Sequence, residues 1–344
     1  MIKLFSDSKY YVFCPGNVVT GGAELLHQLV SFLRDNGKDA YIVYYVGFNG
    51  EIPSDYKKYN IKYISNLDDI IDSEHNIEIL FEPMFYRATS DTKTQKLLWW
   101  LSVDNFFRCS SDYLSIYDIA KWSVRQALNV LIKRCLSIFK MENSSNHKYS
   151  LKDISHLDVV SAYQSEYAQN FLLNNGFREM FPLKDYINIE HCTSFSKEDR
   201  ENIILYNPKK GLKFTQKLIK MSPDLTWIPI VNMTRQQVIE LMSKAKIYVD
   251  FGFHPGKDRL PRECAMNGLC IITGYRGSAR YYEDVWINNE YKFDENKDSK
   301  DQIITKIRDT LNHYDSAIND FSFYRSRISL EKDEFEREVK EFLM

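Results

Sequence analysis

The stretch "TRQQVIELMSKAKIYVDFGFHPGKDRLPRECAMNGLCIITG", residues 234–274, decides the fold that we predict. Its pattern predicts, in order, a threonine-capped helix over 234–245, a buried strand over 246–253, a short helix over 263–268 and a strand over 269–274. Alternating helices and strands are typical of a parallel sheet that helices cover. The charged loop 254–262 is therefore expected at the carboxyl end of a strand, where such sheets bind ligands.

The same alternation occurs in both halves of the chain. In the first half a strand over 10–15 leads through Gly21 and Gly22 into a helix with apolar residues at 25, 26, 29, 30 and 33. In the second half "NIILYN" leads through "PKKG" into another helix. We predict an α/β fold with two Rossmann-like domains facing a central cleft. The predicted segments are 1–190, with an insertion at about 112–147, 191–325, and a C-terminal helix 326–344.

Composition narrows the class of protein. The chain has 344 residues, 44% of them hydrophobic, and its 45 basic and 47 acidic side chains lack the excess of positive charge of a general nucleic-acid binder. No run reaches the ~18 apolar residues of a membrane span, and the start lacks the pattern of a secretion signal, so we expect a cytoplasmic protein. The 6 cysteines form no CxxC pair and no metal-ligand spacing with the 7 histidines, so no metal site is predicted.

Two glycine-bearing turns are candidate anion sites. Gly21 and Gly22 stand where a strand passes into a helix, and the amides of a helix N-terminus favour an anion. A tight turn without a ligand explains them equally well. In the second half Asn207, Lys209 and Lys210 stand at the corresponding turn, where a lysine can meet a diphosphate. A pair of solvated lysines is the alternative there.

The loop 254–262 carries the strongest site prediction. Its Lys257, Arg259 and Arg262 are expected to meet phosphates, and Glu263 is expected to accept hydrogen bonds from sugar hydroxyls. The structural alternative is that Glu263 complements a helix dipole while the arginines face solvent. We favour the functional interpretation because the charge is concentrated at the expected ligand edge of the sheet.

These segments resemble the GT-B glycosyltransferases, and among them the large retaining group called family four. The segment "GGAELLHQLVSFLRDNGKDAYIV" is similar to that family's N-terminal glycine turn, "NIILYNPKKG" to its Lys-Gly turn, and residues 234–274 to its C-terminal signature. The resemblance implies that Lys210 contacts the donor diphosphate and that Glu263 binds the donor ribose. The family's earlier glutamate is replaced by Pro255, and its arginine before the lysine is missing, so Lys209, Lys257 or Arg259 would supply that charge.

The resemblance implies a retaining, metal-independent transferase without a cofactor. It would move a hexosyl or related group from a nucleotide-diphosphate sugar to a hydroxyl of a glycan or lipid-linked acceptor, in cell-surface polysaccharide biosynthesis. Lys210, Arg259 and Glu263 are the expected catalytic residues, and Gly21, Gly22, Asn207, Lys209 and Lys257 complete the expected donor site. The departures leave open a catalytically silent nucleotide-sugar-binding partner, and the architecture leaves open a nucleotide-sugar epimerase.

Two segments of the first half bear on the acceptor. Asp104 follows a predicted strand, where family members often carry polar residues near the acceptor, although a helix cap explains it too. Residues 121–140 contain five basic residues and no acidic one. As a helix they form a broad apolar face with basic residues beside it, which suits an anionic membrane surface or packing on the N-terminal domain. We therefore expect the protein at the inner face of the cytoplasmic membrane.

Overall fold

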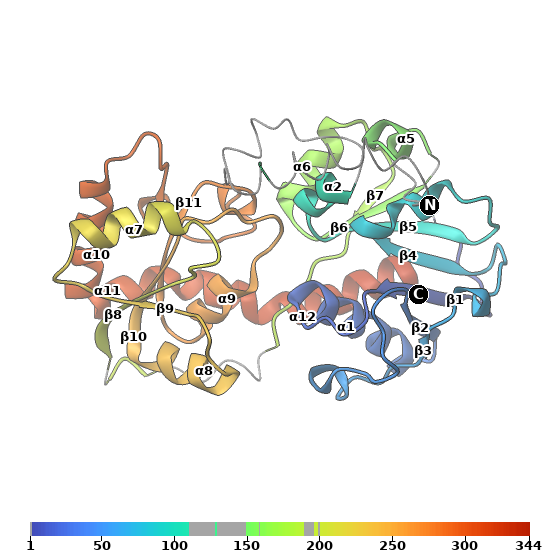
Figure 1. The fold of residues 1–344 in the computed structure, drawn as a ribbon, viewed down its shortest axis with the longest axis horizontal. Coiled ribbons are helices and arrows are strands. Elements are labelled where there is room, and N and C mark those ends of the chain that lie inside the picture. The colour runs from blue at the N-terminus through green and yellow to red at the C-terminus, as the bar shows by residue number, and fades with distance from the viewer. Residues whose placement is uncertain (1, 110–127, 129–148, 158, 189–195, 199) are drawn as a thin grey trace. The chain divides into compact units, whose positions relative to one another are not determined.

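The structure is a computed structural model, and it describes residues 2–109, 128, 149–157, 159–188, 196–198 and 200–344 (Figure 1). The chain divides into two compact units. The N-terminal unit comprises residues 1–163, 170–183 and 339–344, and the C-terminal unit comprises residues 164–169 and 184–338. The domain limits 190/191 and 325/326 stay a prediction, and the basic segment 121–140 lies outside the described residues except for Leu128.

The N-terminal unit is built on one parallel sheet. In its described residues the strand order is β3-β2-β1-β4-β5-β6-β7. The strands are β1 (Lys9–Cys14), β2 (Asp39–Tyr44), β3 (Tyr63–Ile64), β4 (Ile77–Phe81), β5 (Gln95–Trp100), β6 (Val160–Tyr163) and β7 (Met180–Pro182). The inner strands β1, β4, β5 and β6 are mostly apolar and almost wholly buried, because both faces of a parallel sheet are covered.

The described α-helices of this unit include the one that the sequence predicts after the first strand. They are α1 (Gly21–Asp35), α2 (Val103–Cys109), α5 (Leu151–Ser155) and α6 (Glu166–Asn174), whose first residues belong to the C-terminal unit. Helix α1 begins where the Thr20 hydroxyl accepts a hydrogen bond from the Ala23 amide, and it packs against β1 and β2. Its predicted apolar face is confirmed, since the residues at 25, 26, 29, 30 and 33 are all buried.

The C-terminal unit repeats this architecture. Its described strands, in the order β12-β11-β10-β8-β9, are all parallel. They are β8 (Glu201–Tyr206), β9 (Thr226–Pro229), β10 (Ala245–Asp250), β11 (Cys270–Gly274) and β12 (Lys292–Phe293). The helices are α7 (Leu212–Met221), α8 (Arg235–Lys244), α9 (Arg259–Met266), α10 (Lys300–Asn312), α11 (Tyr314–Ala317) and α12 (Ser322–Leu343). Because β10 lies between β8 and β11, the carboxyl ends of these three strands meet at one edge.

The structure corrects the start of one predicted helix and confirms another helix. The helix after β10 was expected to start at Glu263, but α9 begins at Arg259 after Asp258. The first turn of a helix tolerates Pro261 because the amides there have no partner within the helix, so the proline did not mark the start. The expected C-terminal helix is α12, and its end does return to the N-terminal unit, where Tyr10 Oη donates to the Leu343 carbonyl at 2.6 Å.

Among the helices that the structure describes, none is both long enough and apolar enough to cross a bilayer.

Candidate functional site

The turn between β8 and α7 is shaped by Asn207. Its side-chain oxygen accepts a hydrogen bond from the Lys209 amide at 3.0 Å, and its carbonyl accepts from the Lys210 amide at 3.3 Å. The Lys209 side chain is exposed, whereas that of Lys210 is half-buried. The structure therefore gives Asn207 a role in the turn itself and leaves Lys209 more exposed than Lys210.

Two glycines let this turn press onto the end of β10. Gly211 has a φ of +61°, and a Cβ atom there would lie 2.5 Å from the carbonyl of Phe251. A Cβ atom on Gly252 would lie 2.4 Å from Cβ of Lys210. Only glycine fits at both positions, and the close approach brings the Lys210 ammonium to 2.5 Å from Asp258 Oδ2.

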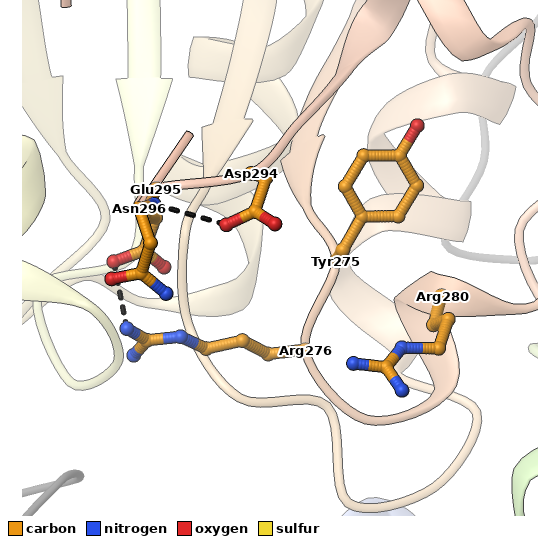
Figure 2. A pocket seen from close by; sticks show the side chains of 6 residues that line it. All are labelled: Tyr275, Arg276, Arg280, Asp294, Glu295 and Asn296. Carbon is orange, nitrogen blue, oxygen red and sulfur yellow. Dashed lines mark hydrogen bonds and ion pairs between the residues drawn. The ribbon is translucent and has the colours of Figure 1, made fainter. Parts of the chain in front are cut away.

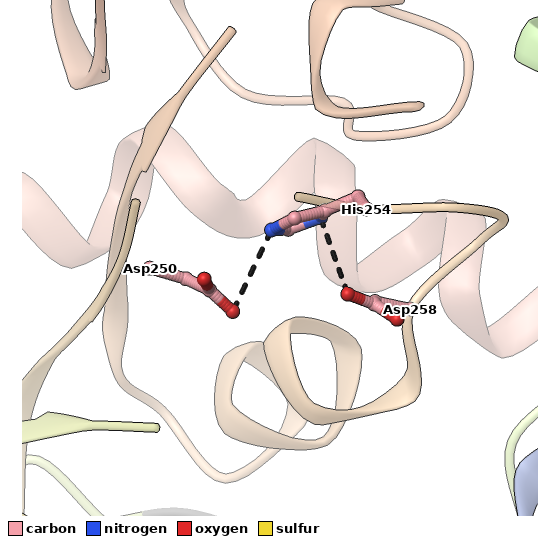
Figure 3. A group of neighbouring side chains, drawn as sticks. All are labelled: Asp250, His254 and Asp258. Atoms are coloured by element: carbon pink, nitrogen blue, oxygen red, sulfur yellow. Dashed lines mark ion pairs between the residues drawn. The ribbon is translucent and has the colours of Figure 1, made fainter. Parts of the chain in front are cut away.

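Beneath Lys210 lies a buried histidine that sequence analysis did not single out. The His254 ring stands between two carboxylates, with Nε2 3.5 Å from Asp250 Oδ2 and Nδ1 3.6 Å from Asp258 Oδ2 (Figure 3). Burial disfavours a charged imidazole, but the charges of Asp250 and Asp258 outweigh it and raise the pKa of His254. The i, i+4, i+8 spacing of these residues in the sequence was the signal that could have found them.

Asp250, His254 and Asp258 also have the composition of a metal site. In the described part of the chain, these three side chains lie as close together as metal ligands do. One ligand atom of each lies within 4.8 Å of the others. The protein's own donors already serve the two carboxylates, however. Asp250 accepts from Tyr248 Oη at 2.9 Å and from the Gly252 amide at 2.7 Å, and Asp258 holds Lys210. We therefore assign the group as an ion-pair cluster.

Glu263 lies inside α9 and faces a cation from another helix. Both of its carboxylate oxygens are 2.9 Å from the guanidinium of Arg235, the first residue of α8. The Glu263 side chain is 8% exposed, whereas that of Arg235 is 41% exposed, so the arginine lies toward solvent. Arg235 was missed in the sequence because a cation at a helix start has no pattern that distinguishes it from a solvated one.

The remaining basic residues of the loop meet internal carboxylates. Arg262 is fully buried and contacts Asp185 Oδ2 at 2.7 Å and Glu331 Oε2 at 2.8 Å. Lys257 pairs with Glu331 at 2.7 Å, and Arg259 Nε lies 3.9 Å from Asp185. The expectation that Arg262 meets a phosphate is wrong, since its guanidinium has no exposed surface. Lys257 is nearly as buried, so its place in a donor site stays a prediction.

The N-terminal unit carries the other predicted glycines. Gly21 is the first residue of α1, and Gly22 follows it. A Cβ atom on Gly22 would make only an ordinary contact, 3.8 Å from Leu101 Cδ1, so the packing of this chain does not require glycine there. The position is thus compatible with a ligand that approaches the start of α1, and both interpretations of this turn stay open.

Asp104 lies in the first turn of α2 and is buried. A neighbouring acid in the same unit, Glu82, was missed in the sequence. Glu82 follows β4 and accepts a hydrogen bond from the Ser102 amide, while its second oxygen, Oε2, is buried with no hydrogen-bond partner in the described chain. Burial raises the pKa of Glu82 to about 8, against the hydrogen bonds that favour its charge. This carboxyl can therefore carry a proton at neutral pH.

A polar pocket of about 120 Å³ opens where β11 and β12 end. Figure 2 shows its lining, which consists of Tyr275, Arg276, Arg280, Asp294, Glu295 and Asn296. Arg276 Nη2 lies 2.8 Å from Glu295 Oε2, and burial raises the pKa of Glu295 to about 6 despite that arginine. The pocket offers hydrogen-bond donors and acceptors side by side, which matches a hydroxylated ligand.

Solved structures share this fold. Sucrose-phosphate synthase from Thermosynechococcus elongatus superposes with a TM-score of 0.63 and 9% identity, covering 97% of this chain and 98% of that one. Anabaena HepE in complex with UDP-glucose gives 0.62 and 11%, covering 97% and 99%. WaaG, a glycosyltransferase involved in lipopolysaccharide biosynthesis, gives 0.53 and 10%, covering 96% and 99%.

No protein-family model matches the chain, and no curated protein is similar enough in sequence to match. At 9–11% identity the three structures establish the fold alone. They are similar to this chain along nearly its whole length, through both parallel sheets. The predicted architecture is thus confirmed: the chain has the GT-B fold of these glycosyltransferases.

Proposed function

We propose that the protein is a glycosyltransferase that uses a nucleotide-diphosphate sugar as donor. The observation that carries this proposal is the cluster at the carboxyl edge of the C-terminal sheet, where Lys210, Asp258 and His254 meet next to α9. Ligands of open parallel sheets bind at this edge. The fold supports the same function, because Anabaena HepE has this fold and was solved with UDP-glucose.

The chemistry requires that the departing diphosphate be stabilised as charge develops on it. In the proposal Lys210 and Arg259 supply fixed positive charge, Asn207 and Lys209 complete the turn, and the start of α1 at Gly21 and Gly22 offers backbone amides. Glu263 accepts hydrogen bonds from the donor ribose. These groups serve a metal-independent reaction, since cations of the protein itself would neutralise the leaving group, and the reaction needs no cofactor.

The finer parts of the proposal come from the sequence. We expect transfer with retention to a hydroxyl of a glycan or lipid-linked acceptor in cell-surface polysaccharide biosynthesis, at the inner face of the cytoplasmic membrane. Asp104 belongs to the acceptor side of this proposal on the same ground, and we add Glu82, a buried acid whose pKa is raised to about 8 by burial. The basic segment 121–140 would bind anionic lipid and so bring the protein to its acceptor.

Calorimetric titration with UDP and UDP-glucose tests the donor site. Glu263→Ala should weaken the binding of both ligands at least tenfold and abolish transfer, because the ribose loses its acceptor. Glu240→Ala, an exposed acid on α8, is the matched control and should bind like the wild type. Far-UV circular dichroism would show that the Glu263→Ala chain is folded. An unchanged UDP affinity in that folded variant would refute the ribose assignment.

Turnover separates the candidate functions. Transfer of label from the nucleotide sugar to an acceptor supports the glycosyltransferase. Donor binding without any product would support the silent binding partner that Pro255 and the internally paired Lys257 favour. Isomerised donor without acceptor would identify an epimerase.

A further inference from the structure

We propose that His254 is a positioning residue of the diphosphate site, and that its charged ring keeps Asp258 neutralised when Lys210 turns to a phosphate. This inference rests on the proposed function, since it concerns the lysine that faces the donor. It adds a residue that the resemblance did not assign. His254, Asp258 and Lys210 follow one another from the interior to the surface, and this order determines what each side chain can do.

The imidazole is the innermost of these groups. His254 has no exposed surface, and its two nitrogens lie 3.5 and 3.6 Å from carboxylate oxygens of Asp250 and Asp258 (Figure 3). Asp258 comes next and is 20% exposed, and its Oδ2 faces both the ring and the ammonium of Lys210. Lys210 is outermost and is 31% exposed. A ligand at this edge can therefore reach Lys210 without moving His254.

The backbone around His254 holds the ring in place. The Ser278 amide donates to the His254 carbonyl at 2.8 Å, and the Ser278 hydroxyl donates to the Gly256 carbonyl at 2.7 Å. Gly277 lies so close to His254 that an added Cβ would be 1.9 Å from the His254 carbonyl oxygen. The loop after β11 thus locks the segment that carries the ring, and Asp258 is positioned by a rigid support.

Charge balance gives the ring its role. Two carboxylates, Asp250 and Asp258, are matched by two cations, Lys210 and a protonated His254. When Lys210 contacts a phosphate, a neutral ring would leave both carboxylates uncompensated beside the incoming anion. Negative charges this close together repel one another strongly where water is excluded. A charged ring removes that repulsion, so Lys210 can leave its 2.5 Å contact with Asp258 at little cost.

The groups that face the ring predict how binding depends on pH. They are Asp250 of β10, Asp258 before α9, and Lys210 of the β8–α7 turn, and the aspartates raise the pKa of the ring. A diphosphate that draws Lys210 away strengthens the effect of Asp258 on the ring. Diphosphate binding therefore takes up a proton on His254, and affinity should fall as pH rises through the pKa of the ring.

The test is calorimetric titration of UDP into the full chain between pH 6 and 9. Wild-type Kd should rise by up to tenfold per pH unit above the pKa of the ring, the slope of one linked proton. His254→Gln should bind UDP at least tenfold more weakly at pH 6 and lose that slope. His313→Gln, which changes a histidine that is 69% exposed, is the matched control and should follow the wild type. Any change in the protonation of UDP itself affects the measurements on all three proteins equally.

Parallel pH profiles for His254→Gln and the wild type would overturn the inference. Nitrogen NMR of the wild-type imidazole provides a measurement that needs no variant to fold. Both ring nitrogens should be protonated at pH 7, and UDP should raise the pKa of the ring; a neutral ring at pH 7 would overturn the inference. A wild-type chain that binds no nucleoside diphosphate would refute the proposed function and the role of His254 with it, whereas binding without the His254 effect would refute only the latter.

Discussion

The buried Arg262 offers a sharp test of what stabilises the C-terminal unit. Its guanidinium contacts Asp185 Oδ2 at 2.7 Å and Glu331 Oε2 at 2.8 Å, and it donates to the Lys257 carbonyl at 2.9 Å. We consider Arg262→Met, which keeps much of the side-chain volume and removes the charge. The change leaves two buried carboxylates, of which Asp185 has lost its closest cation and Glu331 has lost one of two.

The expected loss in the free energy of unfolding depends on which carboxylate keeps a cationic partner. Glu331 retains Lys257 at 2.7 Å, whereas Asp185 retains Arg259 only at 3.9 Å, so the penalty falls mainly on Asp185. Breaking a buried ion pair by removing one partner costs about 3–5 kcal/mol. We expect Arg262→Met to lower the free energy of unfolding by about 4 kcal/mol. The double variant Arg262→Met, Asp185→Leu should recover most of this loss, because no unpaired carboxylate remains.

Urea unfolding followed by tryptophan fluorescence measures these differences as shifts in midpoint at constant slope. Arg308→Met is the control, since Arg308 pairs with Asp224 at 2.5 Å on the surface, and its midpoint should stay at the wild-type value. The reasoning is refuted if Arg262→Met costs less than ~1 kcal/mol or if the Asp185→Leu change adds to the loss instead of reversing it.

The same pair has a pH signature. Burial alone would raise the pKa of Asp185, but Arg262 and its neighbours hold it below the ordinary value. A depressed pKa contributes stability that is present above the pKa of the unfolded chain and is lost as pH falls through the folded value. The difference between the wild type and Arg262→Met should therefore shrink in acid.

The remaining predictions concern other parts of the chain. Gly211→Ala should destabilise the protein by about 1–3 kcal/mol and abolish UDP binding, because its Cβ would overlap the Phe251 carbonyl at 2.5 Å. Gly176→Ala is the control and should keep UDP binding, because nothing lies within 4 Å of the added Cβ. Urea midpoints and UDP calorimetry check both, and a Gly211→Ala chain that binds UDP normally would contradict the close packing. Because the pKa of Glu82 is raised from 4.5 to about 8, the folded state binds more protons in this interval, so stability should fall as pH rises through it; melting temperatures of Glu82→Gln should lack this fall. Changing Leu128, Leu131 and Ile138 to serine should abolish flotation with anionic vesicles, and equal flotation, or none from either protein, would remove the membrane proposal.

Local sequence patterns predicted much of the architecture. Runs such as 10–15 and 246–253 are apolar enough to be buried strands, and the apolar face of residues 21–35 was correct in each position. These features depend on neighbours within a few residues, which is the range over which helix and strand periodicity acts. The expectation that charge gathers at the carboxyl edge of the C-terminal sheet followed from the same alternation. The start of α9 was missed because Pro261 is tolerated in a first turn.

The partners of the charged residues were decided only by tertiary structure. Lys257 and Arg262 meet Glu331, and Arg235 meets Glu263, through contacts between segments far apart in the chain. No periodicity encodes such pairs, because they depend on which helices pack together. Burial of His254 was equally hidden, since it depends on the packing of the loop after β11 against the segment that follows β10. The sequence thus determined where the charge lies along the sheet edge, and packing determined which charges face a ligand and which neutralise one another.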